Sequence, residues 1–292
     1  MNEIMPFLEA TFGLLVLIFT VSNLGTMGLQ VDVEGVSRAL KNKRALLLIF
    51  VWGWIIGPAL GYLIIWILPL DEPYKVVVLL CSIAPVAPFL QQMVSKARGN
   101  MAFAGALIPL VTVGTVLLMP IMVPIMIKGV EINTWSLAKP LLLTILLPLI
   151  IGVVTRHYVD TVATWSFPLI KLIAKLSTLL LIIWCLVLYG SSILDTAGSF
   201  ALLAMTLYMV GMAMITYYFG FGLKQAHRSV MALGMGTRNI AAVLAAALSI
   251  PNVDERILTM TVMWTLWSFV LATIGARIFA KQAVKADDSV SA

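Results

Sequence analysis

The chain has 292 residues, of which 61% are hydrophobic and only 11% are charged, and its formal net charge is +6. Soluble domains carry about 25% charged residues, so this composition excludes an ordinary soluble protein and predicts an all-α membrane protein. The positive charge does not indicate a nucleic-acid partner, because the basic residues fall in short segments between apolar stretches. The expected partner of the polypeptide is therefore the lipid bilayer.

A membrane-crossing helix needs roughly 20 mainly apolar residues, and the chain offers nine such stretches. They lie at about 4–30, 44–69, 74–97, 101–127, 136–156, 165–193, 200–222, 227–250 and 256–280. The first stretch lacks a basic flank and a small-residue cleavage site, so we expect a retained span rather than a signal peptide. Residues 1–292 are therefore expected to form one polytopic membrane domain, with a flexible tail at 282–292.

The Lys and Arg residues outside the middle of the spans fall mainly on one side of the expected membrane. Fourteen lie on that side: Arg38, Lys41, Lys43, Arg44, Lys96, Arg98, Arg156, Lys171, Lys175, Lys224, Arg228, Arg277, Lys281 and Lys285. Four lie on the other side: Lys75, Lys128, Lys139 and Arg256. Because loops rich in Lys and Arg stay in the cytoplasm, we predict an outer N-terminus, a cytoplasmic C-terminus and a location in the inner (plasma) membrane of a cell.

The third stretch, at about 74–97, contains Pro85 and Pro88 near its middle. Proline lacks the backbone N–H donor and clashes with the preceding helical turn, so we expect the helix to break around Ala84–Pro88. Pro88 suits the first turn of a second half-helix, where the missing donor is not needed. The sequence therefore predicts a discontinuous helix in this stretch.

The eighth stretch, at about 227–250, has five small or polar residues at its middle: Gly234, Gly236, Thr237, Arg238 and Asn239. The two glycines weaken a helix by roughly 0.5–1 kcal/mol each relative to alanine, so we expect a second break here. A guanidinium at mid-bilayer costs at least about 2.5–3.5 kcal/mol. We therefore interpret Arg238 as a ligand of a negatively charged solute. The alternative is that it caps carbonyls of the broken helix or pairs with Glu9.

Two interrupted helices in oppositely oriented halves of a chain indicate a secondary transporter with inverted repeats. We expect one repeat at about 1–130, with four spans, and a second at about 131–281, with five. The two discontinuous helices would then cross near the solute, and transport would proceed by alternating access. The alternative is a pair of ordinary helices kinked by proline and glycine, which membrane proteins tolerate.

Four polar residues near the breaks are further candidates for binding the solute: Gln91, Gln92, Thr237 and Asn239. Amides facing lipid are costly, so at least one of the two glutamines is expected to face the crossing. Thr237 is also a candidate N-cap of the outer half-helix, and Thr237 and Asn239 have the alternative role of satisfying backbone groups at the break. The chain contains no phosphate-binding loop, zinc-protease motif or Cys/His cluster, so we expect neither an enzyme nor a cofactor.

Three segments resemble helix signatures of the bile acid:sodium symporter superfamily. The fourth-helix signature is matched by Ala84, Pro85, Gln91 and Ala97–Asn100. The ninth-helix signature is matched by Gly236–Ile240 and the small-residue run Ala241–Leu248, and Met27–Leu29 fits the second helix. The resemblance covers essentially the whole chain, minus one N-terminal helix of the ten-helix members. It implies core and panel domains, crossing broken helices in the core, and transport of organic anions that is commonly coupled to two sodium ions.

The resemblance also implies where sodium ligands would lie, and in this chain most of those positions lack a suitable side chain. The first site falls at Leu90, Gln91, Ala104 and Ile108, the shared glutamate falls at Gly234, and the second site's glutamines fall at Gly53 and Arg238. A guanidinium offers only donors and repels a cation. We therefore expect no metal ligands and interpret Arg238 as a tethered cation that replaces the coupling ion.

These observations predict a carrier of small organic anions, such as carboxylates or bile-acid-like solutes, that works without stoichiometric sodium. One alternative is a sodium-coupled anion symporter with unconventional ligands, including the backbone around the eighth stretch. A second alternative, from a different class, is a channel or a non-transporting receptor on the same scaffold. A channel needs a continuous polar path, and the spans other than the third and eighth contain few polar residues.

Overall fold

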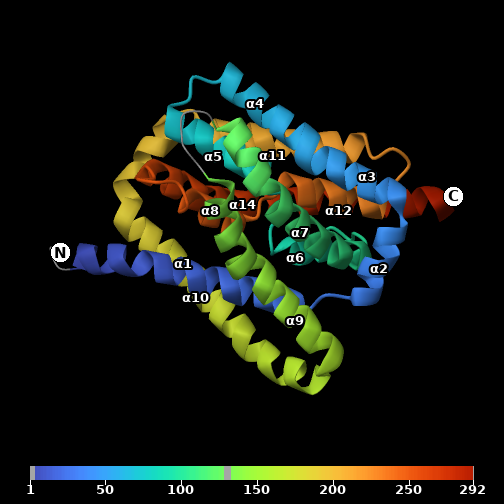
Figure 1. Ribbon diagram of the computed structural model, residues 1–292. Helices are drawn as coiled ribbons and strands as arrows, with labels where there is room; N and C mark the ends of the chain where they lie inside the picture. The colour runs from blue at the N-terminus through green and yellow to red at the C-terminus, as the bar shows by residue number, and fades with distance from the viewer. Residues whose placement is uncertain (1–3, 128–132, 292) are drawn as a thin grey trace.

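The computed structural model describes residues 4–127 and 133–291, and every named element in these ranges is helical (Figure 1). The first part contains α1 (Ile4–Leu29), α2 (Val33–Lys41), α3 (Lys43–Val51), η1 (Trp52–Ile56), α4 (Gly57–Ile67), α5 (Glu72–Ser82), α6 (Leu90–Lys96) and α7 (Met101–Met126). The second part contains α8 (Thr134–Leu141), η2 (Leu142–Leu146), α9 (Leu147–Tyr158), α10 (Asp160–Gly198), α11 (Ala201–Tyr218), α12 (Gln225–Gly236), α13 (Ile240–Ala247) and α14 (Glu255–Ser291). The all-helical prediction is confirmed.

Seven continuous helical segments in the described ranges are long and apolar enough to cross a membrane. They are Ala10–Leu29, Lys43–Ile67, Met101–Met126, Thr134–Tyr158, Asp160–Trp184, Ala201–Tyr218 and Glu255–Val284. The other two expected stretches are each divided into a pair of short helices, α5 with α6 and α12 with α13. Neither member of a pair has the roughly 20 residues that a complete span needs.

Two of the long segments contain a π-helical turn that ends two residues before a proline. η1 precedes Pro58, and η2 precedes Pro148. Because proline lacks a backbone donor and crowds the turn before it, a single wide turn lets each helix continue through the proline. These prolines therefore leave the spans continuous, unlike the prolines between α5 and α6.

α1 and α9 approach each other so closely that their backbones are in contact. A Cβ atom added to Gly28 would lie 2.3 Å from the carbonyl oxygen of Leu149, and one added to Gly152 would lie 2.7 Å from that of Gly25. Such distances exclude any side chain at Gly28 and Gly152 without movement of a helix. The two glycines thus fix the packing of α1 against α9, which with α10 forms the lower group of helices in Figure 1.

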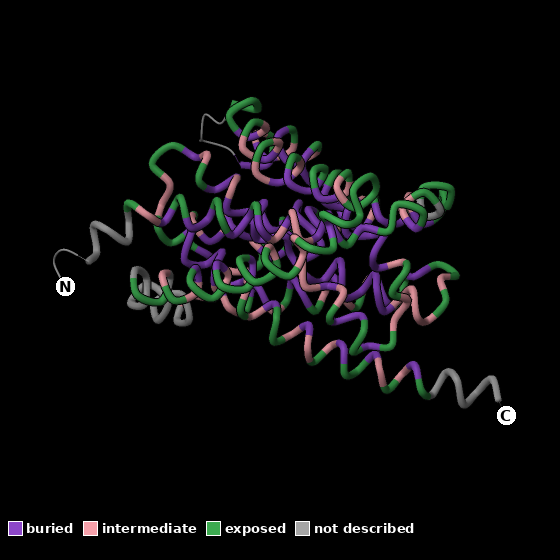
Figure 2. The backbone as a smooth tube through the Cα atoms, turned by 90° about the horizontal axis from the view of Figure 1, so that it is seen from below, coloured by how far each residue is buried: buried purple, intermediate pink, exposed green. Residues whose placement is uncertain are grey.

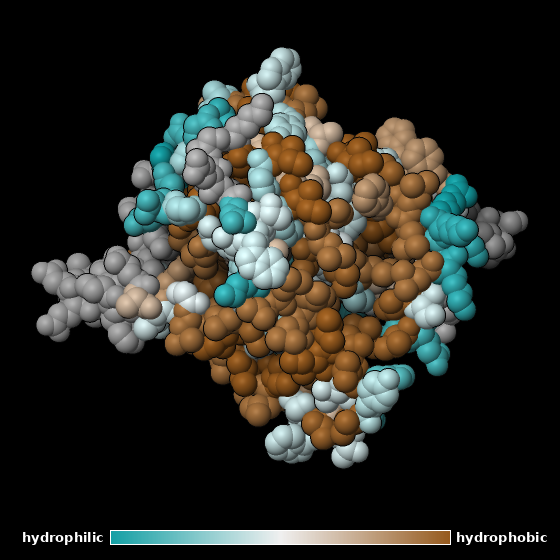
Figure 3. Space-filling view, in the orientation of Figure 1, coloured by the Kyte–Doolittle hydropathy of each residue, from teal (hydrophilic) through white to brown (hydrophobic). Residues whose placement is uncertain are grey.

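The start of α1 and the end of α14 lie at opposite ends of the molecule (Figure 1). Hydrophobic side chains cover the middle of the face in Figure 3, and hydrophilic side chains gather toward two opposite sides. This distribution is typical of a protein surrounded by a bilayer. α14 continues to Ser291, through most of the segment at 282–292 for which a flexible tail is expected, because Ala, Lys and Gln favour helix.

The buried residues gather in the middle of the molecule (Figure 2). Residues 77–87, from α5 into the segment after it, are all buried, and so are residues 229–244 from α12 and α13. By contrast, α9 and α10 expose large apolar side chains along their length. The interrupted helices therefore lie at the core of the fold, and continuous helices surround them.

Candidate functional site

The two interruptions lie directly against each other. The first separates Ser82, at the end of α5, from Leu90, at the start of α6. The second separates Gly236, at the end of α12, from Ile240, at the start of α13. An isolated antiparallel bridge between Pro85 and Arg238 joins the two extended segments. Segments about 150 residues apart in the sequence are thus paired in the interior.

Backbone hydrogen bonds connect the interruptions in both directions. The N–H of Val86 donates to the carbonyl oxygen of Thr237 at 3.0 Å, and the N–H of Asn239 donates to that of Ala84 at 2.8 Å. Each unsatisfied backbone group in a bilayer core costs several kcal/mol. Each interruption therefore supplies partners that the other one needs, and neither is stable in the membrane without its counterpart.

Val86 holds an uncommon backbone conformation at this crossing. Its φ angle is +71°, in the left-handed region that β-branched residues rarely adopt. The residue is fully buried, and its N–H donates to two carbonyl oxygens, those of Gly234 and Thr237. Such strain costs on the order of 1–3 kcal/mol and persists only where the surroundings enforce it. Pairing with the second interruption therefore enforces the conformation of the first.

Thr237 and Asn239 both use their side chains to satisfy backbone groups. The Thr237 Oγ1 accepts from the Ala87 N–H at 3.1 Å and donates to the carbonyl oxygen of Leu233 at 2.8 Å. The Asn239 Oδ1 accepts from the Ala242 N–H at 3.3 Å, which makes Asn239 the N-cap of α13. The cap expected at Thr237 is therefore supplied by Asn239, because Thr237 turns toward the other interruption instead.

Arg238 is buried at the crossing, with only 1% of its surface exposed. Its Nη2 donates to the carbonyl oxygen of Met235, and its guanidinium carbon lies 4.5 Å from the ring centroid of Tyr208. The Nε and Nη1 atoms have no hydrogen-bond partner in the described part of the chain. Buried charged donors without acceptors are costly. The side chain of Glu9, the expected alternative partner, lies outside the described residues.

Tyr208 of α11 is a site residue that the sequence analysis missed. It is fully buried, its ring lies under the guanidinium of Arg238, and its hydroxyl donates to the carbonyl oxygen of Ser82 at 3.3 Å. An aromatic ring attracts a cation through its negatively polarised face. The available signal was a phenol in the middle of an apolar span, where its hydroxyl needs a partner.

Gln91 and Gln92 do not share one environment. Gln91 is half-buried and lines an open cavity of about 770 Å³ between α1, α2 and their connection, α6, α9 and α10. Gln92 is exposed. Arg156 and His157 at the end of α9 also line this cavity, as does Asp32 near the start of α2. The structure thus places one glutamine in a polar cavity and leaves the other outside it.

Apolar side chains surround the positions at which the family's first sodium site would fall. A Cβ atom added to Gly234 would lie 3.0 Å from a methyl of Leu107 and 3.3 Å from a methyl of Leu90. Ala104 and Ile108 are buried in the same core. Among the described residues, no group of three or more His, Cys, Asp or Glu side chains is arranged to hold a metal ion. These positions offer methyl groups where a hard cation needs oxygen.

Three expected positions differ slightly from the observed interruption. Gly234 lies inside α12 rather than at its end, because this glycine allows close packing against Leu90 and Leu107. Gly236 is the last residue of α12, and Pro88 lies two residues before α6 begins. Gly53 lies beside the crossing, since a Cβ atom added there would be 3.4 Å from Pro85 Cγ.

Comparison with known proteins shows that the sequence is similar to one family of membrane proteins. The profile of the Sodium Bile acid symporter family matches residues 13–196, more than half of the chain. The chain is also 26% identical over 164 residues to the probable chloroplastic sodium/metabolite cotransporter BASS2 of rice (Oryza sativa subsp. japonica), covering 53% of this chain and 38% of that protein. It is 24% identical over 229 residues to the corresponding BASS3 of Arabidopsis thaliana, covering 76% of this chain and 53% of that protein.

The chain thus spans about half or less of the curated relatives that it matches. The matched profile includes the first interruption and ends before the second one, so Arg238 lies outside it. The expected resemblance is confirmed. The chain belongs to the sodium bile acid symporter family, which consists of membrane transporters rather than enzymes.

Proposed function

We propose that this chain is a secondary active transporter that carries small organic anions by alternating access, without stoichiometric sodium. In this proposal nine spans form two inverted repeats, at about 1–130 and 131–281, and the two interrupted helices count as one span each. The antiparallel bridge between the interruptions supports this arrangement, because crossed discontinuous helices hold the solute site in many transporters with inverted repeats.

The observation that carries the proposal is the buried guanidinium of Arg238. It lies at the crossing with two donors unpartnered in the described part of the chain. In the ranges with described side chains, no carboxylate forms an ion pair with it. A permanent positive charge in an apolar interior attracts an anion strongly, because the interaction is little screened there. Arg238 therefore supplies a fixed charge that a bound cation supplies in a sodium-coupled carrier.

The packing around Gly234 supports the absence of sodium coupling. Leu90 and Leu107 fill the space beside this residue, and hard cations are held by oxygen ligands. A second cation close to Arg238 would also be repelled by it. In the proposed cycle, neutralisation of the fixed charge by the solute takes the place of ion binding.

The cavity beside Gln91 is the proposed route of the anion to Arg238. Its volume of about 770 Å³ falls within the range of small-molecule sites. Gln91 offers an amide donor, and Arg156 provides positive charge at the wall formed by α9. The cavity separates α1, α9 and α10, proposed as the panel, from α6, proposed as part of the core. With the predicted orientation, it opens toward the cytoplasm of the cell whose plasma membrane holds the protein.

A sodium-coupled symporter is the second candidate, favoured by the printed descriptions of both relatives as sodium/metabolite cotransporters. In this alternative, backbone carbonyls near Met235 and Thr237 would bind the cation. The carbonyl oxygen of Met235 accepts from Arg238 in the structure, so a cation there would have to displace the guanidinium.

Transport assays in proteoliposomes separate these candidates. A panel of labelled carboxylates and steroid conjugates is offered with an inward gradient of sodium or of choline. We expect saturable uptake and counterflow that are equal in the two salts, and loss of both in Arg238→Gln. Arg98→Gln, which removes an exposed charge, is the matched control. Uptake that requires sodium and persists in Arg238→Gln would support the symporter. Non-saturable flux without counterflow would indicate a channel, and no flux for any solute would support a receptor.

A further inference from the structure

A second cavity lies on the other side of the second interruption, between α11, α12 and α14. It has a volume of about 310 Å³, and it is lined almost entirely by apolar side chains, including Met209, Ala213, Met214, Leu271, Gly275 and Ile278. Met214 and Ile278 are about half exposed at its edge. Because α11 and α14 are membrane-spanning helices, this groove opens toward the hydrocarbon of the bilayer.

One end of the groove reaches the interruption itself, at Gly236 and Thr237. Small residues make room for the groove along its floor. A Cβ atom added to Gly275 would lie 3.5 Å from a methyl of Leu233, an ordinary van der Waals distance. The space above Gly275 therefore exists because this position lacks a side chain, and a larger residue there would fill it.

The other end of the groove carries aromatic and polar groups. Tyr217 and Phe279 stack there, with ring centroids 4.7 Å apart. Arg228 does not line the groove itself, but its guanidinium carbon lies 5.1 Å from the centroid of the Tyr217 ring. Gln282 lines the same end. The Nε of Arg228 and the Oε1 of Gln282 are buried, and neither has a hydrogen-bond partner in the described ranges. Lys281, adjacent in sequence, is exposed.

We propose that this groove binds an anionic glycerophospholipid of the surrounding bilayer. One acyl chain lies along the apolar floor, and the phosphate lies at the end marked by Tyr217 and Arg228. Arg228 supplies a donor and positive charge for the phosphate, and Gln282 supplies an acceptor for a hydroxyl of the headgroup. Positive charge at this end favours an anionic headgroup over a zwitterionic one.

The site is separate from the polar cavity at Gln91, and the two share none of their lining residues. The lipid assignment does not depend on which solute is carried or on whether sodium is coupled. It has a consequence for the crossing, because the end of the acyl chain would lie against Thr237. A bound lipid then packs against the second interruption at Gly236 and Thr237.

The test uses the full-length protein, purified in detergent and titrated with palmitoyl-oleoyl phosphatidylglycerol or with phosphatidylcholine of the same chains. Retained lipid is counted by native mass spectrometry. We expect one phosphatidylglycerol molecule to be retained in preference to phosphatidylcholine. Arg228→Gln should reduce that preference about fivefold, since one basic residue near a membrane surface contributes about 1 kcal/mol. Arg277→Gln removes an exposed charge of α14 and should leave the preference unchanged.

A second pair of variants tests the apolar part of the groove. Gly275→Leu should abolish retention of either lipid, and Gly275→Ala should keep most of it. Circular dichroism and gel filtration show whether Gly275→Leu is folded. If this variant does not fold, Arg228→Gln still tests the proposal independently. Equal retention of the two lipids by the unmodified protein would overturn the proposal. So would a folded Gly275→Leu variant that retains phosphatidylglycerol normally, or an equal loss of preference in Arg277→Gln.

Discussion

The two interrupted helices solve the same structural problem with different residues. Between α5 and α6 the chain uses Pro85 and Pro88, and it carries no charged side chain between Ser82 and Leu90. Between α12 and α13 it uses Thr237, Arg238 and Asn239 and has no proline. Both segments are buried, and each offers backbone groups to the other. One interruption is therefore defined by backbone shape, and the other by side-chain chemistry.

This difference assigns distinct roles to the two halves of the crossing. Pro85 and Pro88 lack backbone donors whether or not a solute is bound, so we expect the first interruption to be the more rigid partner. The second interruption is held extended by hydrogen bonds that the side-chain oxygens of Thr237 and Asn239 accept from backbone N–H groups. Substitutions in the second interruption are therefore expected to disturb the crossing most, and the following predictions compare it with the first interruption and with an exposed ion pair.

The largest loss of stability is expected for Thr237→Val. The change keeps the side chain's shape but removes the Oγ1 that accepts from the Ala87 N–H. A buried donor left without its acceptor costs about 1–3 kcal/mol, and the apparent melting temperature in detergent should fall accordingly. Thr261→Val is the matched control, because the Thr261 hydroxyl is equally buried but donates only to the carbonyl of Ile257 in its own helix. Equal shifts in both variants would contradict the role of Thr237.

A smaller loss of stability is expected at Val86, where we expect the glycine variant to be more stable than the alanine variant. Val86→Ala loses about 1–2 kcal/mol of buried apolar contact and keeps a strained φ, because alanine also avoids the left-handed region. Val86→Gly loses slightly more contact but releases strain on the order of 1–3 kcal/mol. The glycine variant should therefore melt at a higher temperature than the alanine variant.

Val77 in α5 serves as the control for this order. It is equally buried but lies within a regular helix, where glycine costs about 1 kcal/mol more than alanine. Thermal denaturation should thus rank glycine below alanine at Val77 and above it at Val86. The same ranking at both positions would mean that Val86 is not strained by the second interruption.

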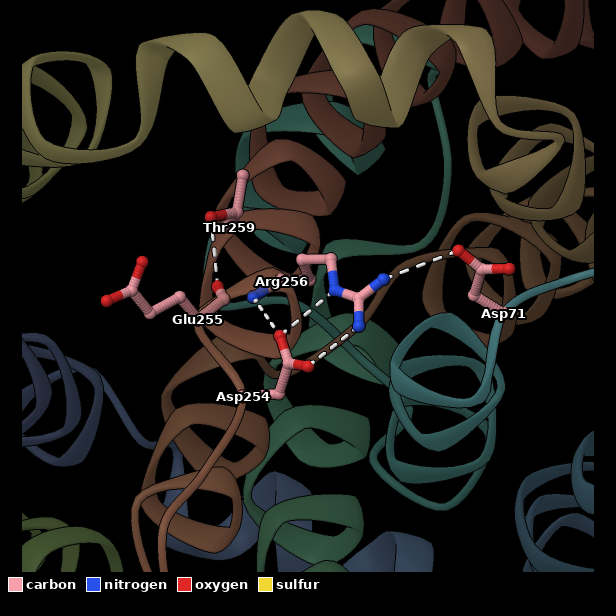
Figure 4. Close-up of polar contacts among 5 residues, drawn as sticks. All are labelled: Asp71, Asp254, Glu255, Arg256 and Thr259. Atoms are coloured by element: carbon pink, nitrogen blue, oxygen red, sulfur yellow. Dashed lines mark hydrogen bonds and ion pairs between the residues drawn. The ribbon is translucent and has the colours of Figure 1, made fainter.

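The smallest effect is expected at Arg256, where the segment after α13 meets the segment before α5 (Figure 4). Arg256 contacts Asp254, which follows α13, at 2.9 Å and Asp71, which precedes α5, at 3.4 Å. These groups are substantially exposed, so Arg256→Gln should cost less than about 1 kcal/mol. Raised ionic strength should further reduce the difference in stability between Arg256→Gln and the unmodified protein.

The ion pair between Arg256 and Asp254 makes the stability difference between Arg256→Gln and the unmodified protein depend on pH. The hydrogen bond from Arg256 lowers the pKa of Asp254 below its ordinary value of 3.8. A carboxyl group with a lowered pKa in the folded state stabilises the protein above its ordinary pKa and loses that effect as the pH falls through the lowered value. Melting temperatures of the two proteins should therefore differ constantly above about pH 5 and converge below about pH 4. A difference that grows in acid would contradict the assignment.

Sequence reasoning located both interruptions, the first from Pro85 and Pro88 and the second from Gly234 and Gly236, because proline and glycine weaken a helix locally. It could not predict the φ angle of Val86 or the hydrogen bond from the Ala87 N–H to the Thr237 Oγ1, since both require two segments about 150 residues apart to meet. Tyr208 was missed for the same reason, because only the packing of α11 places its ring under Arg238.

Gly234 illustrates a related error in the sequence analysis. A glycine inside an apolar span is equally consistent with a helix break and with close packing of a neighbouring helix. Here Gly234 allows Leu90 and Leu107 to approach α12. Local propensity alone does not distinguish these roles. The family profile also ends before this helix, so the residues of the second interruption have to be assigned from their own contacts.

The most direct test of the account is a thermal-shift screen of the purified protein against organic anions, with sodium or with choline as the cation. Each stabilising anion is repeated on Arg238→Gln and on the control Arg98→Gln. We predict stabilisation that is the same in both salts, is lost in Arg238→Gln and is retained in the control. Stabilisation that requires sodium and survives in Arg238→Gln would contradict the claim that Arg238 takes the place of a coupling ion.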